Sequence, residues 1–154
     1  MATIEKRFVR EVIALDATAA CSEAARLMAK HGIGSVGVRR GGKLVGLVTE
    51  RDLVAGVLGR VDPDRTTLGE AMRADQPTVS PRATERECAD LMRSRRTRHL
   101  AVKDGAEIVG VVSMLDLVEL VVQESEYRID QLETYIGGGR TRQLSQPIAA
   151  VFGR

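Results

Sequence analysis

The chain has 154 residues, of which 44% are hydrophobic and 29% charged, enough for one compact body or two small ones that share a core. Its net charge of +2 creates no overall field toward nucleic acid or a membrane, and an aromatic content of 3% argues against a stacking platform for single-stranded nucleic acid. No apolar run is long enough to span a bilayer, and Met1 to Arg10 lacks the apolar segment of a secretory signal. We therefore expect a cytoplasmic protein without a membrane partner, in which Cys21 and Cys88 are separate core residues.

The stretch from Val12 to Val57 recurs without a gap 64 residues later, as Gln76 to Val121. Fourteen of the 46 aligned pairs are identical, against about 3 expected at average composition. A repeat of this length is a supersecondary unit that needs its copy to complete a core, and the seam between two units is a natural place for a ligand. We divide the chain into repeat 1 with a lead-in (1–66), repeat 2 (67–122), a helical extension (123–136) and a mobile tail (137–154).

Each repeat is predicted to have the order β-α-β-β-α, which places the chain in the mixed α/β (α+β) class. In repeat 1 a short strand leads to Asp16, which we expect to cap a helix that Gly32 ends. Ser80 and Pro81 predict the same helix start in repeat 2. The third strand is a continuous apolar run, so we expect both of its faces to be buried. The predicted segments of repeat 1 are the lead-in Thr3–Phe8, strand Val12–Leu15, helix Ala17–Lys30, strand Val36–Val38, turn Arg40–Lys43, strand Leu44–Val48, helix Thr49–Leu58 and linker Gly59–Thr66, and a lead-in at Thr67–Arg73 precedes repeat 2.

The last helix is predicted to run past repeat 2 and to end at Gly137-Gly138-Gly139. Its residues at steps of three and four come close to a heptad stripe. This stripe either packs on its own chain or pairs with the same helix of a second subunit. We favour a homodimer, because the extension has no duplicate within the chain to cover it. The stripe consists of Val118, Val122, Ser125, Ile129, Leu132 and Ile136.

The strongest local pattern is Gly46-Leu-Val-Thr49-Glu-Arg-Asp52, which recurs as Gly110-Val-Val-Ser113-Met-Leu-Asp116. Here a buried strand delivers the chain to a helix N-terminus, where a hydroxyl, free N–H groups and a carboxylate converge. Such a carboxylate can accept two hydrogen bonds from a vicinal diol such as ribose. The same spacing is also that of a capping box, in which the acid reaches back to the first residue. The two roles can coexist, because a cap uses only part of the acceptor capacity of a carboxylate.

The whole pattern resembles a tandem pair of CBS domains, or Bateman module, of the stand-alone bacterial type. The resemblance covers about residues 3–122 and is carried by the two motifs above, by His31–Val38, by Arg98–Val102 and by the order of elements. It implies two β-α-β-β-α units related by a pseudo-twofold axis, followed by the extended helix. It also implies a regulatory protein that binds AMP, ADP or ATP, or alternatively NAD or S-adenosylmethionine, and acts through a conformational or assembly change.

The resemblance further implies roles for individual residues. The final Asp of each motif would hold the ribose diol, and the hydroxyl three residues earlier would contact sugar or phosphate. Basic residues before the middle strand of repeat 2 would take phosphates, and the residue before the first Asp would reach the neighbouring site. The candidate ligand-binding residues are Thr49, Arg51, Asp52, Arg98, His99, Ser113 and Asp116.

The two halves differ at the positions that would bind phosphate. Repeat 1 has Gly34 and Ser35 where repeat 2 has Arg98 and His99. If these basic groups and Arg51 converge, the site built on Asp116 binds phosphate better than the one built on Asp52. The basic run 93–99 has two other interpretations, a solvated helix end or, least favoured, a nucleic-acid contact.

No catalytic motif is present: there is no P-loop, and no nucleophile stands beside a base in a recognisable pattern. His31 has no second ligand at metal-binding spacing, so we expect no metal site. We therefore predict a non-catalytic regulatory module with an unknown regulated partner. The alternative is an assembly protein with vestigial clefts that acts through its C-terminal helix.

Overall fold

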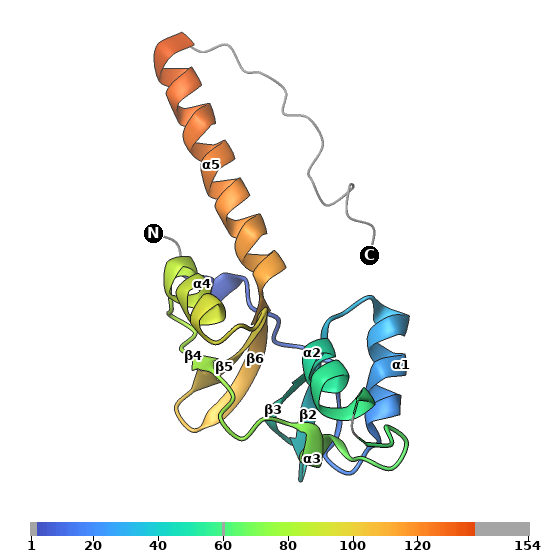
Figure 1. The fold of residues 1–154 in the computed structure, drawn as a ribbon. Coiled ribbons are helices and arrows are strands. Elements are labelled where there is room, and N and C mark those ends of the chain that lie inside the picture. The colour runs from blue at the N-terminus through green and yellow to red at the C-terminus, as the bar shows by residue number, and fades with distance from the viewer. Residues whose placement is uncertain (1–2, 60, 138–154) are drawn as a thin grey trace.

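The computed structural model of the protein describes residues 3–59 and 61–137, which contain two three-stranded sheets and a long final helix (Figure 1). The first sheet has the order β1-β2-β3, with β1 parallel to β2 and β2 antiparallel to β3. The elements of this half are η1 (Ile4–Lys6), β1 (Ala14–Asp16), α1 (Cys21–His31), β2 (Ser35–Arg40), β3 (Lys43–Thr49), α2 (Glu50–Asp52) and the π-helix η2 (Leu53–Leu58).

The second sheet repeats the first, with the order β4-β5-β6 and the same directions. Even the irregularities recur, since each hairpin has a register shift directly after the pair formed by Val38 and Gly46 or by Val102 and Gly110. The duplication seen in the sequence is therefore a duplication of the fold. The elements of this half are α3 (Leu68–Ala71), β4 (Thr78–Val79), α4 (Glu85–Ser94), β5 (His99–Asp104), β6 (Glu107–Ser113) and α5 (Met114–Gly137).

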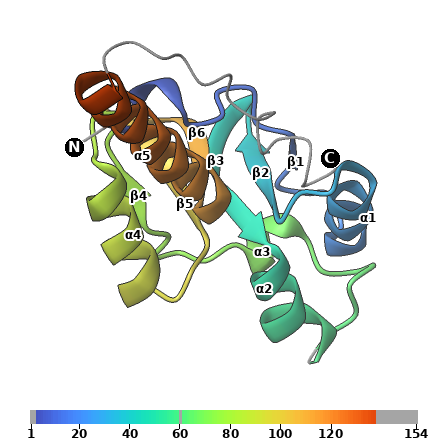
Figure 2. The ribbon, with the colours of Figure 1, turned by 90° about the horizontal axis from the view of Figure 1, so that it is seen from above.

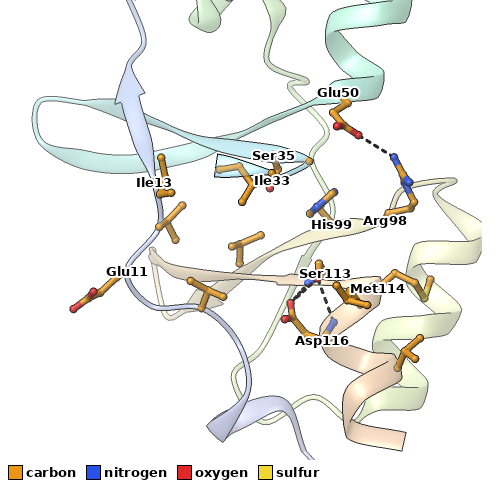
Figure 3. Close-up of a pocket in the computed structure, with 17 residues that line it drawn as sticks. Glu11, Ile13, Ile33, Ser35, Glu50, Arg98, His99, Ser113, Met114 and Asp116 are labelled. Carbon is orange, nitrogen blue, oxygen red and sulfur yellow. Dashed lines mark hydrogen bonds and ion pairs between the residues drawn. The ribbon is translucent and has the colours of Figure 1, made fainter. Parts of the chain in front are cut away.

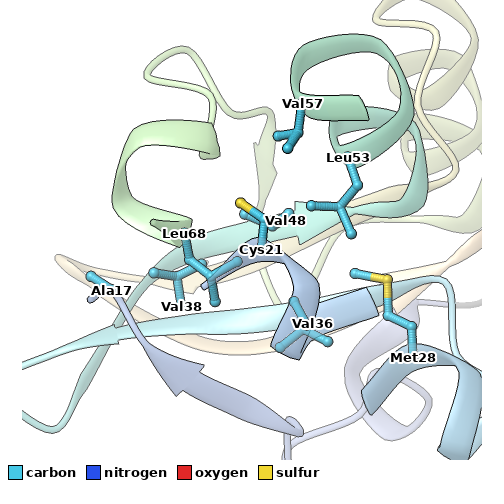
Figure 4. Close-up of a cluster of buried hydrophobic side chains, with 10 residues drawn as sticks. Ala17, Cys21, Met28, Val36, Val38, Val48, Leu53, Val57 and Leu68 are labelled. Carbon is cyan, nitrogen blue, oxygen red and sulfur yellow. The ribbon is translucent and has the colours of Figure 1, made fainter. Parts of the chain in front are cut away.

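The lead-in segments are exchanged between the repeats. Ile4 in η1 is fully buried in the core of repeat 2, and its amide donates to the carbonyl of Ala83. Its counterpart Leu68 in α3 is fully buried in the core of repeat 1 (Figure 4), and its amide donates to the carbonyl of Ala19. Each lead-in therefore completes the core of the other repeat, in two contacts related by the pseudo-twofold axis.

The motif glycines permit this exchange. A Cβ on Gly110 would lie 2.5 Å from the ring of Phe8, and a Cβ on Gly46 would collide with the side chain of Met72, the counterpart of Phe8. Real Cβ atoms essentially never come so close to another heavy atom, so a side chain at either position would force a neighbour to shift, and at Gly110 one of these neighbours is the backbone carbonyl of Val9. The first residue of each motif thus serves the packing of the lead-in.

The two sheets meet through a third apolar cluster that contains Val12, Leu47 and Ala101. Figure 2 shows β3 and β6 side by side in the middle of the molecule, with α1 on one flank and α4 on the other. The expectation that both faces of the third strand are buried was wrong for its first half, because the side chain of Val45 is 37% exposed. Only the second half of β3 is buried, at Gly46, Leu47 and Val48.

The first helix of each repeat begins later than predicted. The Asp16 carboxylate accepts hydrogen bonds from the amide and hydroxyl of Thr18, at 3.0 and 2.7 Å, and so closes a local turn instead of capping α1. The Ser80 hydroxyl accepts from the Arg82 amide in the same way. In repeat 2 the true cap is Thr84, which forms a capping box with Glu87. The end of α1 at Gly32, which has a φ of 62°, agrees with the prediction. The first strand begins two residues later than predicted, at Ala14, and the helix predicted at Thr49–Leu58 is a short α2 followed by the π-helix η2.

Helix α5 extends away from the body of the protein (Figure 1). The side chains of Ile129, Leu132 and Ile136 are 55%, 60% and 82% exposed, so no described part of the chain covers them. The interpretation in which this stripe packs on its own chain is therefore wrong for Ile129, Leu132 and Ile136 within the described residues. The helix reaches Gly137, and the predicted mobile tail lies beyond the described residues apart from that glycine.

Candidate functional site

A cavity of about 660 Å³ lies between the two repeats. Repeat 1 contributes the approach to β1 and the turn between α1 and β2, and repeat 2 contributes the start of β5 and the junction of β6 with α5. Figure 3 shows Ile13 and Ile33 of repeat 1 and Met114 of repeat 2 among its apolar walls. Such a space, mostly apolar with a few convergent polar groups, is typical of a small-molecule site.

Asp116 and Ser113 both line this cavity. The Asp116 Oδ2 atom accepts hydrogen bonds from the Ser113 amide at 2.6 Å and from the Ser113 hydroxyl at 2.7 Å, while the Asp116 amide donates back to that hydroxyl at 3.3 Å. The capping interpretation is therefore confirmed. It leaves the Asp116 Oδ1 atom without a hydrogen-bond partner among residues 3–59 and 61–137, so the carboxylate can still accept from a ligand.

Arg98 and His99 line the same cavity from the start of β5. Burial lowers the pKa of the His99 imidazole below its usual value, and the adjacent Arg98 guanidinium lowers it further. The carboxylates of Glu50, Asp116 and Asp52 oppose this shift without reversing it. The imidazole is therefore neutral near pH 7, and Arg98 supplies the positive charge beside it.

The matching residues of repeat 1 are arranged differently. Thr49 and Asp52 form the same capping box, with the Thr49 amide and hydroxyl 2.9 and 2.7 Å from Asp52 Oδ2. Thr49 and Arg51 line a recess of only about 10 Å³, and Asp52 lines neither this recess nor the large cavity. The Arg51 guanidinium crosses to repeat 2 and donates to the carbonyl of Arg96.

The seven candidate residues therefore fall into two groups. Four of them lie around one cavity: Arg98, His99, Ser113 and Asp116. Thr49 and Arg51 lie at the recess, which shares Gly34, Glu50, Arg98 and His99 with that cavity, and Asp52 is left as a cap.

Sequence reasoning missed Glu50, which lines the cavity and whose carboxylate lies 3.2 Å from the Arg98 guanidinium. Glu50 stands inside the repeated motif, but its counterpart in repeat 2 is Met114, so it is not one of the residues that the two motifs share. Glu11 was also missed, because it precedes the repeat and belongs to no motif. The signal present in the sequence is that this motif position is charged in repeat 1 and apolar in repeat 2.

The described residues also bear on the requirements of a cysteine nucleophile, a metal site and a membrane-spanning helix. Burial raises the pKa of the Cys88 thiol to about 11 and also raises that of Cys21, so neither is a ready nucleophile at neutral pH. Residues 3–59 and 61–137 contain no group of three His, Cys, Asp or Glu side chains that could hold a metal ion. In the same part of the chain, no helix is both long and apolar enough to cross a membrane.

Comparison with known proteins agrees with this architecture. A CBS-domain protein of Burkholderia ambifaria assigned to signal transduction has 36% identity and a TM-score of 0.67, over 74% of this chain and 85% of its own. YhcV of Bacillus subtilis, a CBS domain-containing protein, is 26% identical over 76% of this chain and 84% of its own length. The mitochondrial CBSX3 of Arabidopsis thaliana is 30% identical over 76% of this chain but only 60% of its own length. The CBS domain family model matches residues 6–59 and 68–123, and the chain therefore belongs to the CBS domain family.

Proposed function

We propose that this CBS-domain protein is a non-catalytic regulatory module of the cytoplasm that binds an adenine nucleoside or nucleotide in the cavity between its repeats. AMP, ADP and ATP are the first candidates, followed by NAD and S-adenosylmethionine. Occupancy changes the packing of the two repeats or of two subunits, and an unidentified partner reads the change. Such coupling requires that the ligand bind the two arrangements with different affinity.

The observation that carries the proposal is the composition of the cavity. Its apolar walls suit a purine ring, and the Asp116 carboxylate at the start of α5 suits a ribose diol. The guanidinium of Arg98 lies at the same cavity and suits a phosphate. Because both repeats supply these groups, a ligand here contacts both halves at once.

We further propose that the Asp116 site binds the ligand more strongly than the Asp52 site. The support is that Asp116 lines the large cavity together with Arg98, whereas Asp52 lines neither the cavity nor the recess.

Calorimetric titration of the D116A and D52A variants with AMP and ATP tests both statements. D116A is expected to weaken binding about 10- to 100-fold, because a charged hydrogen-bond acceptor is lost. D52A removes the same kind of capping box, so it controls for the loss of the cap. Equal losses would reject the asymmetry, and a wild-type protein that binds no adenine compound would reject the function.

A second candidate function is assembly through α5, with no ligand in the cavity. It is favoured by the exposed apolar side chains of Ile129, Leu132 and Ile136. A thermal-shift screen separates the two functions, since a ligand that binds only the folded state raises the melting temperature. No shift with AMP, ATP, NAD or S-adenosylmethionine would favour assembly.

A further inference from the structure

We propose that Glu50 is a selectivity residue, which competes with ligand phosphates for Arg98 and so reduces the gain in affinity that each phosphate of an adenine nucleotide brings. This inference rests on the proposed binding of an adenine compound in the cavity. It adds a residue from repeat 1 that decides how strongly phosphate contributes to that binding.

The geometry places Glu50 at the phosphate-binding group. Its Oε2 atom lies 3.2 Å from Arg98 Nη2, in an ion pair that joins α2 of repeat 1 to the start of β5 in repeat 2 (Figure 3). A Cβ on Gly34 would lie 2.9 Å from the His99 ring and 3.4 Å from Glu50 Oε2. The absence of a side chain at Gly34 therefore leaves room for the carboxylate and the imidazole on the same side of the cavity.

The charges around the cavity also oppose the binding of a phosphate. Among the described residues that line the cavity, Arg98 is the sole Arg or Lys, whereas three are acidic: Glu11, Glu50 and Asp116. His99 is neutral near pH 7 because burial lowers its pKa. A phosphate that binds Arg98 must displace the Glu50 carboxylate from the ion pair. It must also approach that carboxylate, which carries a charge of the same sign.

The ion pair belongs to this site and is not a requirement of the fold. Under the 64-residue repeat, Glu50 corresponds to Met114 and Arg98 corresponds to Gly34, so the other half of the molecule has no such pair. Glu50 also takes no part in the capping box, which uses Thr49 and Asp52. The side chains of Glu50 and Arg98 are 52% and 62% exposed, and exposed pairs contribute little to folding.

A second cation, the exposed Arg51, lies at the recess beside the cavity. The recess that holds Arg51 shares Glu50, Arg98 and His99 with the cavity. A polyphosphate that separates Glu50 from Arg98 can extend toward the Arg51 guanidinium. Adenosine has no phosphate that could interact with it. The effect of Glu50 should therefore grow with the number of phosphates.

The test is calorimetric titration of wild type and E50Q with adenosine, AMP and ATP in magnesium-free buffer. E50Q is expected to bind AMP about two- to fivefold more tightly, which is the range of an exposed ion pair, and to gain more for ATP. Its affinity for adenosine is expected to stay within error. The gains should shrink as salt is raised, because they are electrostatic.

The matched control is E107Q. Glu107 forms an equally long ion pair across the two repeats, 3.2 Å from Lys43, but it does not line the cavity. E107Q should leave all three affinities unchanged, and melting curves should show that both variants fold.

The possible outcomes distinguish the two proposals. If wild type binds adenosine or AMP and E50Q shows no gain for AMP or ATP over adenosine, the role of Glu50 is overturned and the proposed function stands. An E107Q variant that gains as much as E50Q would likewise overturn the role of Glu50 alone. If neither wild type nor E50Q binds any of the three compounds, the proposed function fails and this inference fails with it.

Discussion

His99 is the side chain whose charge the cavity controls most directly. Burial and the Arg98 guanidinium lower its pKa, and they outweigh the neighbouring carboxylates. The unfolded chain therefore takes up a proton at a higher pH than the folded chain does. As a result, the free energy of unfolding falls as pH drops below about 6.5 and levels off below the folded-state pKa.

Urea unfolding of wild type and H99N between about pH 5 and pH 8 measures this contribution. The wild-type midpoint should decline with falling pH, and H99N should be flatter in this window. The carboxylates with lowered pKa, Asp16, Glu70 and Glu87, titrate below it and do not interfere. An equally steep H99N profile would contradict the assignment.

The lead-in segments are the elements that join the two repeats most firmly. Ile4 and Leu68 are each 0% exposed, and each lies in the core of the repeat to which it does not belong in sequence. The boundary that we place between residues 66 and 67 thus remains a prediction about the repeats in the sequence. In the folded protein, the core of each repeat includes a residue from the other side of this boundary. Neither repeat has a complete core without the lead-in of the other.

I4A is therefore expected to destabilise the protein by about 2–5 kcal/mol, the usual cost of such a truncation in a core. Hydrogen exchange should show the loss of protection first in α4 and β5, although the mutation lies before repeat 1. L68A is the matched variant and should act first on α1 and β2. If both variants lost protection in the same repeat, the exchange of lead-ins between the repeats would be contradicted.

The molecule as a whole consists of a two-sheet body and the protruding α5 (Figure 1). We propose that a second copy of the chain covers the apolar stripe of that helix, since apolar faces of this kind are rarely left in water. The described residues leave this stripe open along the outer half of α5.

An I129D/L132D variant should be monomeric by sedimentation, and wild type should be dimeric at the same concentration. D130A changes an exposed residue of α5 toward the opposite side of the helix and should remain dimeric. A monomeric wild type, or a dimeric I129D/L132D, would reject the dimer.

Local features were predictable from the sequence because neighbouring residues decide them. Thr49 and Asp52 form their capping box from positions three residues apart, and Gly32 ends α1 through its own backbone. The duplication likewise predicted two similar halves, because a repeated sequence folds into a repeated unit. Asp16 misled the prediction of the helix start, since Ala20 pairs with the distant Thr67 and holds the preceding residues out of the helix.

Only the tertiary structure decided the exchange of lead-ins, the different surroundings of Asp116 and Asp52, and the pairing of Glu50 with Arg98. Each depends on residues that are distant in the chain, and Glu50 and Arg98 are 48 positions apart. Their meeting follows from the pseudo-twofold packing of the sheets, which brings the start of α2 against the start of β5. A sequence determines which groups are available, whereas the docking of one repeat on the other determines which of them share a cavity.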